Sequence, residues 1–189
     1  MITIVSGIPR SGTSMMMQML AAGGLPVLSD NLRMPDADNP RGYFEWEPAK
    51  KLLTQPELIA QAEGKCVKVI SQLLFALPAA HEFQILFINR DLAEVLASQA
   101  EMTRRLGTTV AGLDPAVLRT ALQAHLQQVK AWLGNRKGVR VLELDYSAVV
   151  SEPEIACQAI SQFLNTTLDL AAMKTQVDRA LHRQRASKP

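Results

Sequence analysis

Near its N-terminus the chain reads ITIVSGIPRSGTS, from Ile2 to Ser14. The β-rich run Ile2–Val5 is typical of a buried strand, and helical residues follow over Thr13–Ala22. Between them, Gly7 and Gly12 allow tight backbone turns, so that successive N–H groups can point at one anion at the N-terminus of a helix. This stretch is therefore predicted to be a phosphate-binding loop that joins a strand to a helix.

One position separates this loop from that of nucleoside triphosphatases, whose pattern is G-x-x-x-x-G-K-[ST]. Both glycines and the final Ser14 match, but Thr13 stands where that pattern has lysine. The lysine neutralises the outer phosphates of a triphosphate, and the only cation within this loop is Arg10. The alternative interpretation is a strand-to-helix turn that contains two glycines by chance.

Further β-rich runs alternate with helical patterns along the rest of the chain. The predicted strands cover Cys66–Ile70, Gln84–Ile88 and Val139–Leu144. Helices are predicted over Pro48–Ala62, Leu92–Leu106, Asp114–Gly134, Ser151–Leu164 and Leu170–Leu181, with Asp114 and Ser151 as N-caps. This alternation favours a parallel sheet with helices on both faces. The sequence predicts a single domain over residues 1–189 with an α/β fold: a three-layer P-loop nucleotide-binding fold around a central parallel sheet.

The loop also matches a more specific pattern, G-x-P-[KR]-S-G-T-[ST]. The matching residues are Gly7, Pro9, Arg10, Ser11, Gly12, Thr13 and Ser14. The pattern resembles the 5′-phosphosulfate loop of the sulfotransferases that use 3′-phosphoadenosine 5′-phosphosulfate as donor. The resemblance implies that these residues bind the donor, and that Arg10, together with Ser14, stabilises charge on the leaving oxygen during sulfuryl transfer. It implies a nucleotide co-substrate and no metal.

A second motif follows the predicted strand Gln84–Ile88. Asn89-Arg90-Asp91 comes at its end, and Ser98 lies about two helical turns further on. This resembles the family's 3′-phosphate motif, in which Arg90 would supply charge-assisted hydrogen bonds and Ser98 a hydroxyl. The alternatives are a salt bridge from Arg90 to Asp91 or Glu94, and a neutral helix position for Ser98.

A candidate base lies in the long segment Leu25–Glu47. Residues 39–45 read NPRGYFE, which resembles a segment of several bacterial-type sulfotransferases. Sulfuryl transfer needs a group that takes the acceptor's proton, and apolar neighbours such as Trp46 would raise the pKa of Glu45 toward that task. The alternatives for Glu45 are capping the helix near Pro48 and pairing with Arg41.

Many animal cytosolic members use a histidine after the second strand. The corresponding stretch here, Val67–Gln72, contains none, and the three histidines of the chain lie elsewhere, at His81, His125 and His182. This difference shifts the expected base to Glu45.

Bulk composition excludes several classes of protein. A formal net charge of +2 over 189 residues is too small to indicate nucleic-acid binding. Cys66 and Cys157 form no metal-binding or redox spacing. The N-terminus has no signal peptide pattern, and no apolar run approaches the length of a membrane span. We therefore expect a cytoplasmic protein.

The predicted function is sulfuryl transfer from 3′-phosphoadenosine 5′-phosphosulfate to a hydroxyl or amine of an unidentified small-molecule or carbohydrate acceptor. The segments Leu25–Glu47 and Leu106–Asp114 are expected to shape the acceptor pocket. One alternative is a nucleotide-binding protein without catalytic activity. Another is a small P-loop kinase, although Asn89 stands where a kinase would place an acidic metal ligand, for which Asp145 would be a displaced substitute.

Overall fold

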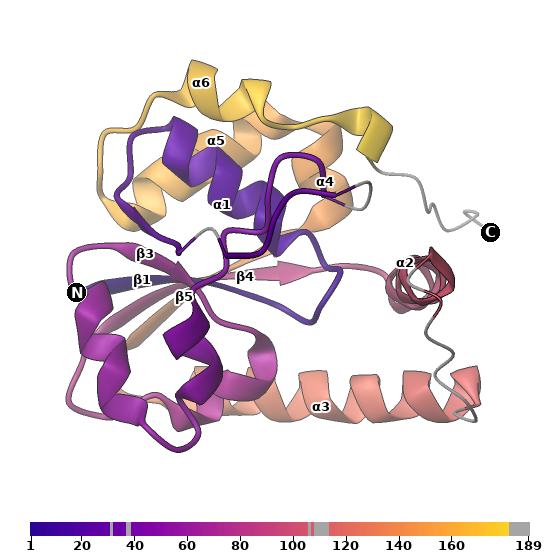
Figure 1. Ribbon diagram of the computed structural model, residues 1–189. Helices are drawn as coiled ribbons and strands as arrows, with labels where there is room; N and C mark the ends of the chain where they lie inside the picture. Colours follow the sequence, from indigo (N-terminus) through magenta and orange to yellow (C-terminus); the bar gives the residue numbers. More distant parts are fainter. Residues whose placement is uncertain (31, 37–38, 106, 108–113, 182–189) are drawn as a thin grey trace.

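A five-stranded sheet, parallel throughout, forms the middle layer of the computed structural model, which describes residues 1–30, 32–36, 39–105, 107 and 114–181 (Figure 1). In spatial order the strands are β2 (Val27–Leu28), β3 (Cys66–Lys68), β1 (Ile2–Ser6), β4 (Phe83–Asn89) and β5 (Val139–Asp145). The predicted α/β fold with a central parallel sheet is therefore confirmed. The short edge strand β2 was not predicted from the sequence.

Helices cover both faces of the sheet, as Figure 1 shows. One face carries α1 (Thr13–Ala22), α4 (Tyr146–Ser151), α5 (Pro153–Leu164) and α6 (Leu170–Thr175). The other face carries α3 (Pro115–Asn135) and the 3-10 helices η1 (Glu47–Lys51), η2 (Pro56–Ala62) and η3 (Ser71–Ala76). The remaining elements are α2 (Leu92–Arg105), which follows β4, and the short η4 (Arg179–Leu181).

Alternate side chains of the central strands pack into these two layers, as the period of a β-strand requires. Leu86 and Ile88 of β4 join the core beneath α1 and α5, whereas Ile85 and Phe87 join the core on the α3 side. Because both faces are covered, β1 is buried along its whole length. The strand that leads into the predicted loop is therefore fixed from both sides.

Three helix predictions are wrong in detail. Pro48–Ala62 is not one helix but the two 3-10 helices η1 and η2, because Pro56, which has no N–H and a fixed φ, begins a new helix. Ser151 is the last residue of α4 and not the cap of α5, which begins at Pro153 after Glu152. The last predicted helix ends early, at Thr175. The Asp114 cap is confirmed, since its side chain accepts from the N–H of Ala116 at 2.8 Å.

The strand order brings the candidate residues to one edge. β1 lies between β3 and β4, so the loop after β1, Lys68 at the end of β3 and Arg90 after β4 meet at the carboxyl ends of parallel strands. Ligands of open α/β sheets bind at this edge. None of the described helices combines the length and apolar composition that crossing a membrane requires.

Candidate active site

The segment Gly7–Ser14 joins β1 to α1, as predicted. Gly12 has a φ of 106°, and a Cβ there would lie 2.4 Å from the Tyr146 ring. At Gly7 a Cβ would lie 2.8 Å from the backbone oxygen of Ile88. Both positions therefore require glycine, because the loop backbone passes directly against its neighbours.

The residues of the loop divide into two groups. Pro9, Arg10, Gly12, Thr13 and Ser14 line a cavity of about 490 Å³. Gly7 and Ser11 do not line the cavity. The Ser11 side chain points away from it, packs against Gly7 and is fully buried. The Ser11 hydroxyl is therefore not directed into the cavity, although the backbone around it forms the turn in which Ser11 N–H donates to the Ile8 carbonyl at 3.1 Å.

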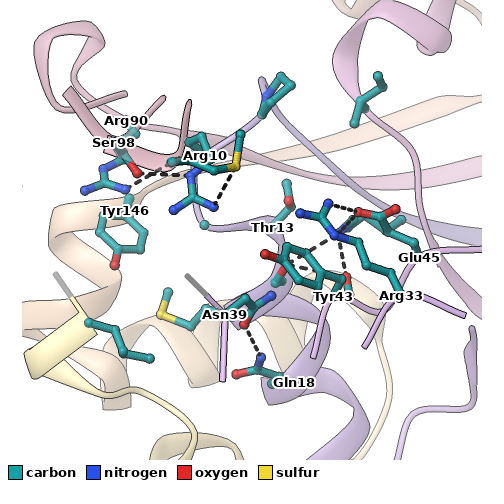
Figure 2. Close-up of a pocket in the computed structure, with 18 of the residues that line it drawn as sticks. Arg10, Thr13, Gln18, Arg33, Asn39, Tyr43, Glu45, Arg90, Ser98 and Tyr146 are labelled. Atoms are coloured by element: carbon teal, nitrogen blue, oxygen red, sulfur yellow. Dashed lines mark hydrogen bonds and ion pairs between the residues drawn. The ribbon is translucent and has the colours of Figure 1, made fainter. Parts of the chain in front are cut away.

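Arg10 connects the loop to the second predicted motif. Its Nε donates to the Ser98 hydroxyl at 3.0 Å, and its backbone carbonyl accepts from Nη1 of Arg90 at 3.0 Å. Figure 2 shows Arg10, Arg90 and Ser98 together on one side of the cavity, beside Tyr146. We call these three residues, with the segment Gly7–Ser14, the loop side of the cavity.

Arg90 has structural contacts of its own. Its Nε donates to Glu94 at 2.9 Å, and both side chains are only 8% exposed. Its guanidinium lies 4.4 Å from the centre of the Tyr146 ring, within the range of a cation–π interaction. The alternative pairing with Glu94 is thus present, and the same side chain also faces the cavity.

Lys68 is a cation that the sequence reasoning missed. It ends β3 with a side chain only 8% exposed, lies 3.3 Å from the Ser14 hydroxyl, and donates to the Tyr43 carbonyl. Burial lowers the pKa of Lys68 to about 8, while nearby Glu45 acts in the opposite direction. The sequence feature that could have indicated Lys68 is a single charged residue within an apolar strand. Lys68 places a cation beside Ser14, where the loop itself has none.

Glu45 lies across the cavity from Arg10 and Arg90. Beside it are Arg33 and Tyr43, as Figure 2 shows, and Lys50. We call these four residues the carboxylate side. The carboxylate pairs with Arg33 at 3.0 Å and Lys50 at 3.3 Å, and Lys68 lies 3.9 Å away. The expectation of apolar surroundings is therefore wrong, because the nearest groups are cations.

Both alternatives for Glu45 are also wrong. Arg41 bonds instead to the carbonyl of Gln176 at 2.9 Å, and it lies 3.9 Å from Asp178. The 3-10 helix η1 has Trp46 at its N-cap and no side-chain cap. The ring of Tyr43 packs under the Arg33 guanidinium, 3.4 Å from the ring centre, which holds the two residues as one unit.

Parts of the expected acceptor pocket fall outside the described residues. Residues 106 and 108–113 of the predicted connection Leu106–Asp114 are among them, so its contribution stays a prediction. Of the segment Leu25–Glu47, five described residues line the cavity: Arg33, Asn39, Tyr43, Glu45 and Trp46. Within the described ranges no group of three or more His, Cys, Asp or Glu side chains is placed to hold a metal ion.

The cavity suits a bound phosphate or sulfate group. It is lined by the N-terminus of α1 and by Arg10, Lys68 and Arg90. Helix N-termini and glycine-containing loops bind such anions through backbone N–H groups, and arginine adds charge-assisted hydrogen bonds. At about 490 Å³ the cavity is within the size range of small-ligand sites.

Comparisons with solved structures return sulfotransferases. A sulfotransferase domain from the curacin biosynthetic pathway aligns with 15% identity and a TM-score of 0.53, over 94% of this chain and 77% of that one. The sulfotransferase domain of the Synechococcus PCC 7002 olefin synthase aligns with 15% identity and a TM-score of 0.58, over 96% and 78%. A sulfotransferase from Alicyclobacillus acidocaldarius aligns with 14% identity and a TM-score of 0.52, over 96% and 95%.

At the level of sequence, no family model matches the chain, and none of the curated proteins does. The structural alignments nevertheless extend over nearly the whole chain. The fold is therefore the one found in sulfotransferases, as the resemblance of the loop predicted.

Proposed function

We propose that this protein is a sulfotransferase that moves the sulfuryl group of 3′-phosphoadenosine 5′-phosphosulfate to a hydroxyl or amine of a small-molecule or carbohydrate acceptor. The observation that carries the proposal is the arrangement of Arg10, Arg90 and Ser98, which come from two predicted motifs and bond to one another at the loop. They line the same cavity as the candidate base Glu45.

The loop side would hold the donor. Backbone N–H groups of residues 12–14, at the N-terminus of α1, would bind the 5′-phosphosulfate, since the N–H of Ser11 already donates to the Ile8 carbonyl. Arg90 and Ser98 would bind the 3′-phosphate, so a nucleotide that has only a 5′-phosphate would lack these contacts. Arg10 lies between these two positions and would contact both the 5′-phosphosulfate and the 3′-phosphate of the donor.

The carboxylate side would hold the acceptor. In transfer, the acceptor oxygen or nitrogen forms a bond to sulfur, the bond from sulfur to the bridging oxygen breaks, and Glu45 accepts the proton that the acceptor loses. Negative charge then develops on the bridging oxygen. Arg10, Ser14 and Lys68 would stabilise that charge, as preorganised donors do in enclosed sites.

One observation favours a second candidate, phosphoryl transfer. Lys68 places a cation beside Ser14, so the absence of lysine from the loop no longer argues against a kinase. The proposed substitute for the acidic metal ligand is nevertheless misplaced, because Asp145 caps α4, accepting from the N–H of Ala148 at 3.0 Å, and does not line the cavity. Asn89, at the strand end, donates to Glu143 at 2.8 Å. Because Asn89, Glu143 and Asp145 are not among the residues that line the cavity, sulfuryl transfer is favoured over a metal-dependent reaction there.

The test is turnover of the donor. The protein is incubated with 3′-phosphoadenosine 5′-phosphosulfate and a panel of hydroxyl and amine compounds, and formation of adenosine 3′,5′-bisphosphate is followed. We expect acceptor-dependent product from the wild type, a strong loss in Lys68→Met, and no loss in Lys65→Met, an exposed lysine on the same segment. Nucleotide binding without turnover would support the non-catalytic alternative, and binding of ATP only with Mg²⁺ would support a kinase.

A further inference from the structure

The backbone carbonyl of Tyr43 occupies an unusual position at the loop. It accepts hydrogen bonds from Nζ of Lys68 and, at 3.4 Å, from the Ser14 hydroxyl. These are two of the donors that line the cavity beside the phosphate-binding loop. An oxygen of the chain itself, with a partial negative charge, thus takes the hydrogen bonds that an anion at the loop would require.

The residue after this carbonyl has a strained backbone. Phe44 has a φ of 52°, in the left-handed region that residues other than glycine rarely adopt. Its side chain packs against the hydrophobic core beneath α1. Such conformations persist where surrounding contacts hold them and are common at switch regions and ligand sites. Here the peptide is held by the bonds of the Tyr43 carbonyl to Ser14 and Lys68 and by the packing of the Phe44 side chain.

Anchors on both sides confine this strain to a short span. On the N-terminal side, Gln18 of α1 donates to the carbonyl of Gly42 at 3.3 Å. On the C-terminal side, the carbonyl of Glu45 accepts from Ser29 Oγ and from the N–H of Asp30, both at 3.1 Å. The peptide between Tyr43 and Phe44 can therefore reorient while the ends of the segment stay in place.

We propose that the Tyr43–Phe44 peptide is an internal ligand of the phosphate-binding loop, which an incoming phosphate or sulfate group displaces. Lys68 is shared between Tyr43 and Glu45, which is 3.9 Å away. When the anion takes the Lys68 ammonium, the Tyr43 carbonyl turns away, Phe44 leaves the left-handed region, and Glu45 loses one of its three cationic neighbours. Arg33 and Lys50 stay paired with Glu45, so the anion removes only the most distant of its three cationic neighbours.

The inference rests on the proposed function in one respect: the displacing anion is taken to be the phosphosulfate of the donor. It makes Phe44 a positioning residue, since it acts through the adjoining carbonyl and does not touch the reacting atoms.

Isotope labelling can observe this one peptide. The sequence contains a single Tyr-Phe step, so carbon-13 at tyrosine carbonyls combined with nitrogen-15 on phenylalanine gives one carbonyl–amide cross-peak, from Tyr43–Phe44. Inorganic pyrophosphate, two linked tetrahedral anions, is the probe, and its binding is measured in parallel by calorimetry. We expect the cross-peak to shift with the same midpoint as binding, and this shift to be absent in Lys68→Met.

A matched pair of variants tests the strain. Phe44→Gly and Phe44→Ala both lose the aromatic ring, but only glycine adopts the left-handed conformation without cost. The internal ligand should persist better in Phe44→Gly, so pyrophosphate should bind it about fivefold more weakly than it binds Phe44→Ala. Because the labelling experiment uses the unaltered chain, it decides the question even if both variants fail to fold.

The outcomes separate the two proposals. Binding of pyrophosphate without a shift of the cross-peak would overturn the internal ligand and leave the sulfotransferase proposal standing. A shift, accompanied by no preference for adenosine 3′,5′-bisphosphate over adenosine 5′-phosphate, would support the internal ligand and contradict the donor assignment. Failure of any anion to bind would overturn both.

Discussion

The two sides of the cavity are built in different ways. The loop side consists of residues that follow buried parallel strands, and its members bond directly to one another through Arg10. The carboxylate side comes mainly from an irregular segment, where Glu45 pairs with Arg33 and Lys50, which are close to it in the chain, and lies near Lys68 at the end of β3. A binding motif can thus be local in sequence while the adjoining chemistry also depends on tertiary contacts, here those of Lys68.

The largest expected effect concerns the carboxylate side. Glu45→Gln keeps the shape of the side chain and removes the base, so sulfuryl transfer should slow by about 10²- to 10⁴-fold. Affinity for adenosine 3′,5′-bisphosphate should stay within about twofold, because the donor lies on the other side. Steady-state kinetics and calorimetry give the two values, and Glu47→Gln, an exposed neighbour, is the control. Unaltered turnover would mean that another group takes the proton.

The next effect tests the loop side. Arg90→Ala combined with Glu94→Gln removes the arginine without leaving its carboxylate partner charged and buried. Relative to Glu94→Gln alone, affinity for adenosine 3′,5′-bisphosphate should fall by about ten- to a hundredfold, because a hydrogen bond to a charged group contributes roughly 1.5–3 kcal/mol. Affinity for adenosine 5′-phosphate should hardly change. Equal losses for both nucleotides would make Arg90 purely structural.

A pH titration probes Lys68, which connects the two sides. Burial lowers the pKa of Lys68 to about 8, so its side chain is an ammonium below that pH and a neutral amine above it. Affinity for inorganic sulfate, which stays a dianion across this range, should therefore fall as pH rises, by up to about tenfold between about pH 7 and about pH 9. Calorimetry across this range should show the step in the wild type and in Lys65→Met. The same step in Lys68→Met would assign it to another group.

The smallest expected effect belongs to Ser98. A neutral hydroxyl contributes about 1 kcal/mol, so Ser98→Ala should weaken binding of adenosine 3′,5′-bisphosphate by about fivefold. The same change also removes the partner of Arg10 Nε. Titration with adenosine 5′-phosphate separates the two effects, since a loss confined to the bisphosphate indicates direct contact with the 3′-phosphate. A loss shared by both ligands would point to displaced Arg10.

Sequence could predict the loop side because its signals are local. Apolar runs that alternate with helical patterns indicate the sheet. Gly7 and Gly12 indicate a tight loop, because a Cβ at either position would clash with its neighbours. Arg90 and Ser98 could be placed near the loop because β4 was recognisable and parallel strands end at one edge. What remained hidden was the bond between Ser98 and Arg10, which joins two motifs far apart in the chain.

The carboxylate side could be predicted only as a candidate residue. The neighbours of Glu45 in sequence are aromatic, but its neighbours in space are Arg33, Lys50 and Lys68. The left-handed conformation of Phe44 has no sequence signal either, since phenylalanine gives no reason to expect it. Both features arise from how the segment folds back over the end of β3.

The donor assignment is tested most directly by the wild-type protein and two nucleotides. Calorimetric titration compares adenosine 3′,5′-bisphosphate with adenosine 5′-phosphate under identical conditions. If Arg90 and Ser98 bind a 3′-phosphate, the bisphosphate should bind at least about tenfold more tightly. Equal affinity for the two nucleotides, or binding of neither, would contradict the assignment of 3′-phosphoadenosine 5′-phosphosulfate as the donor.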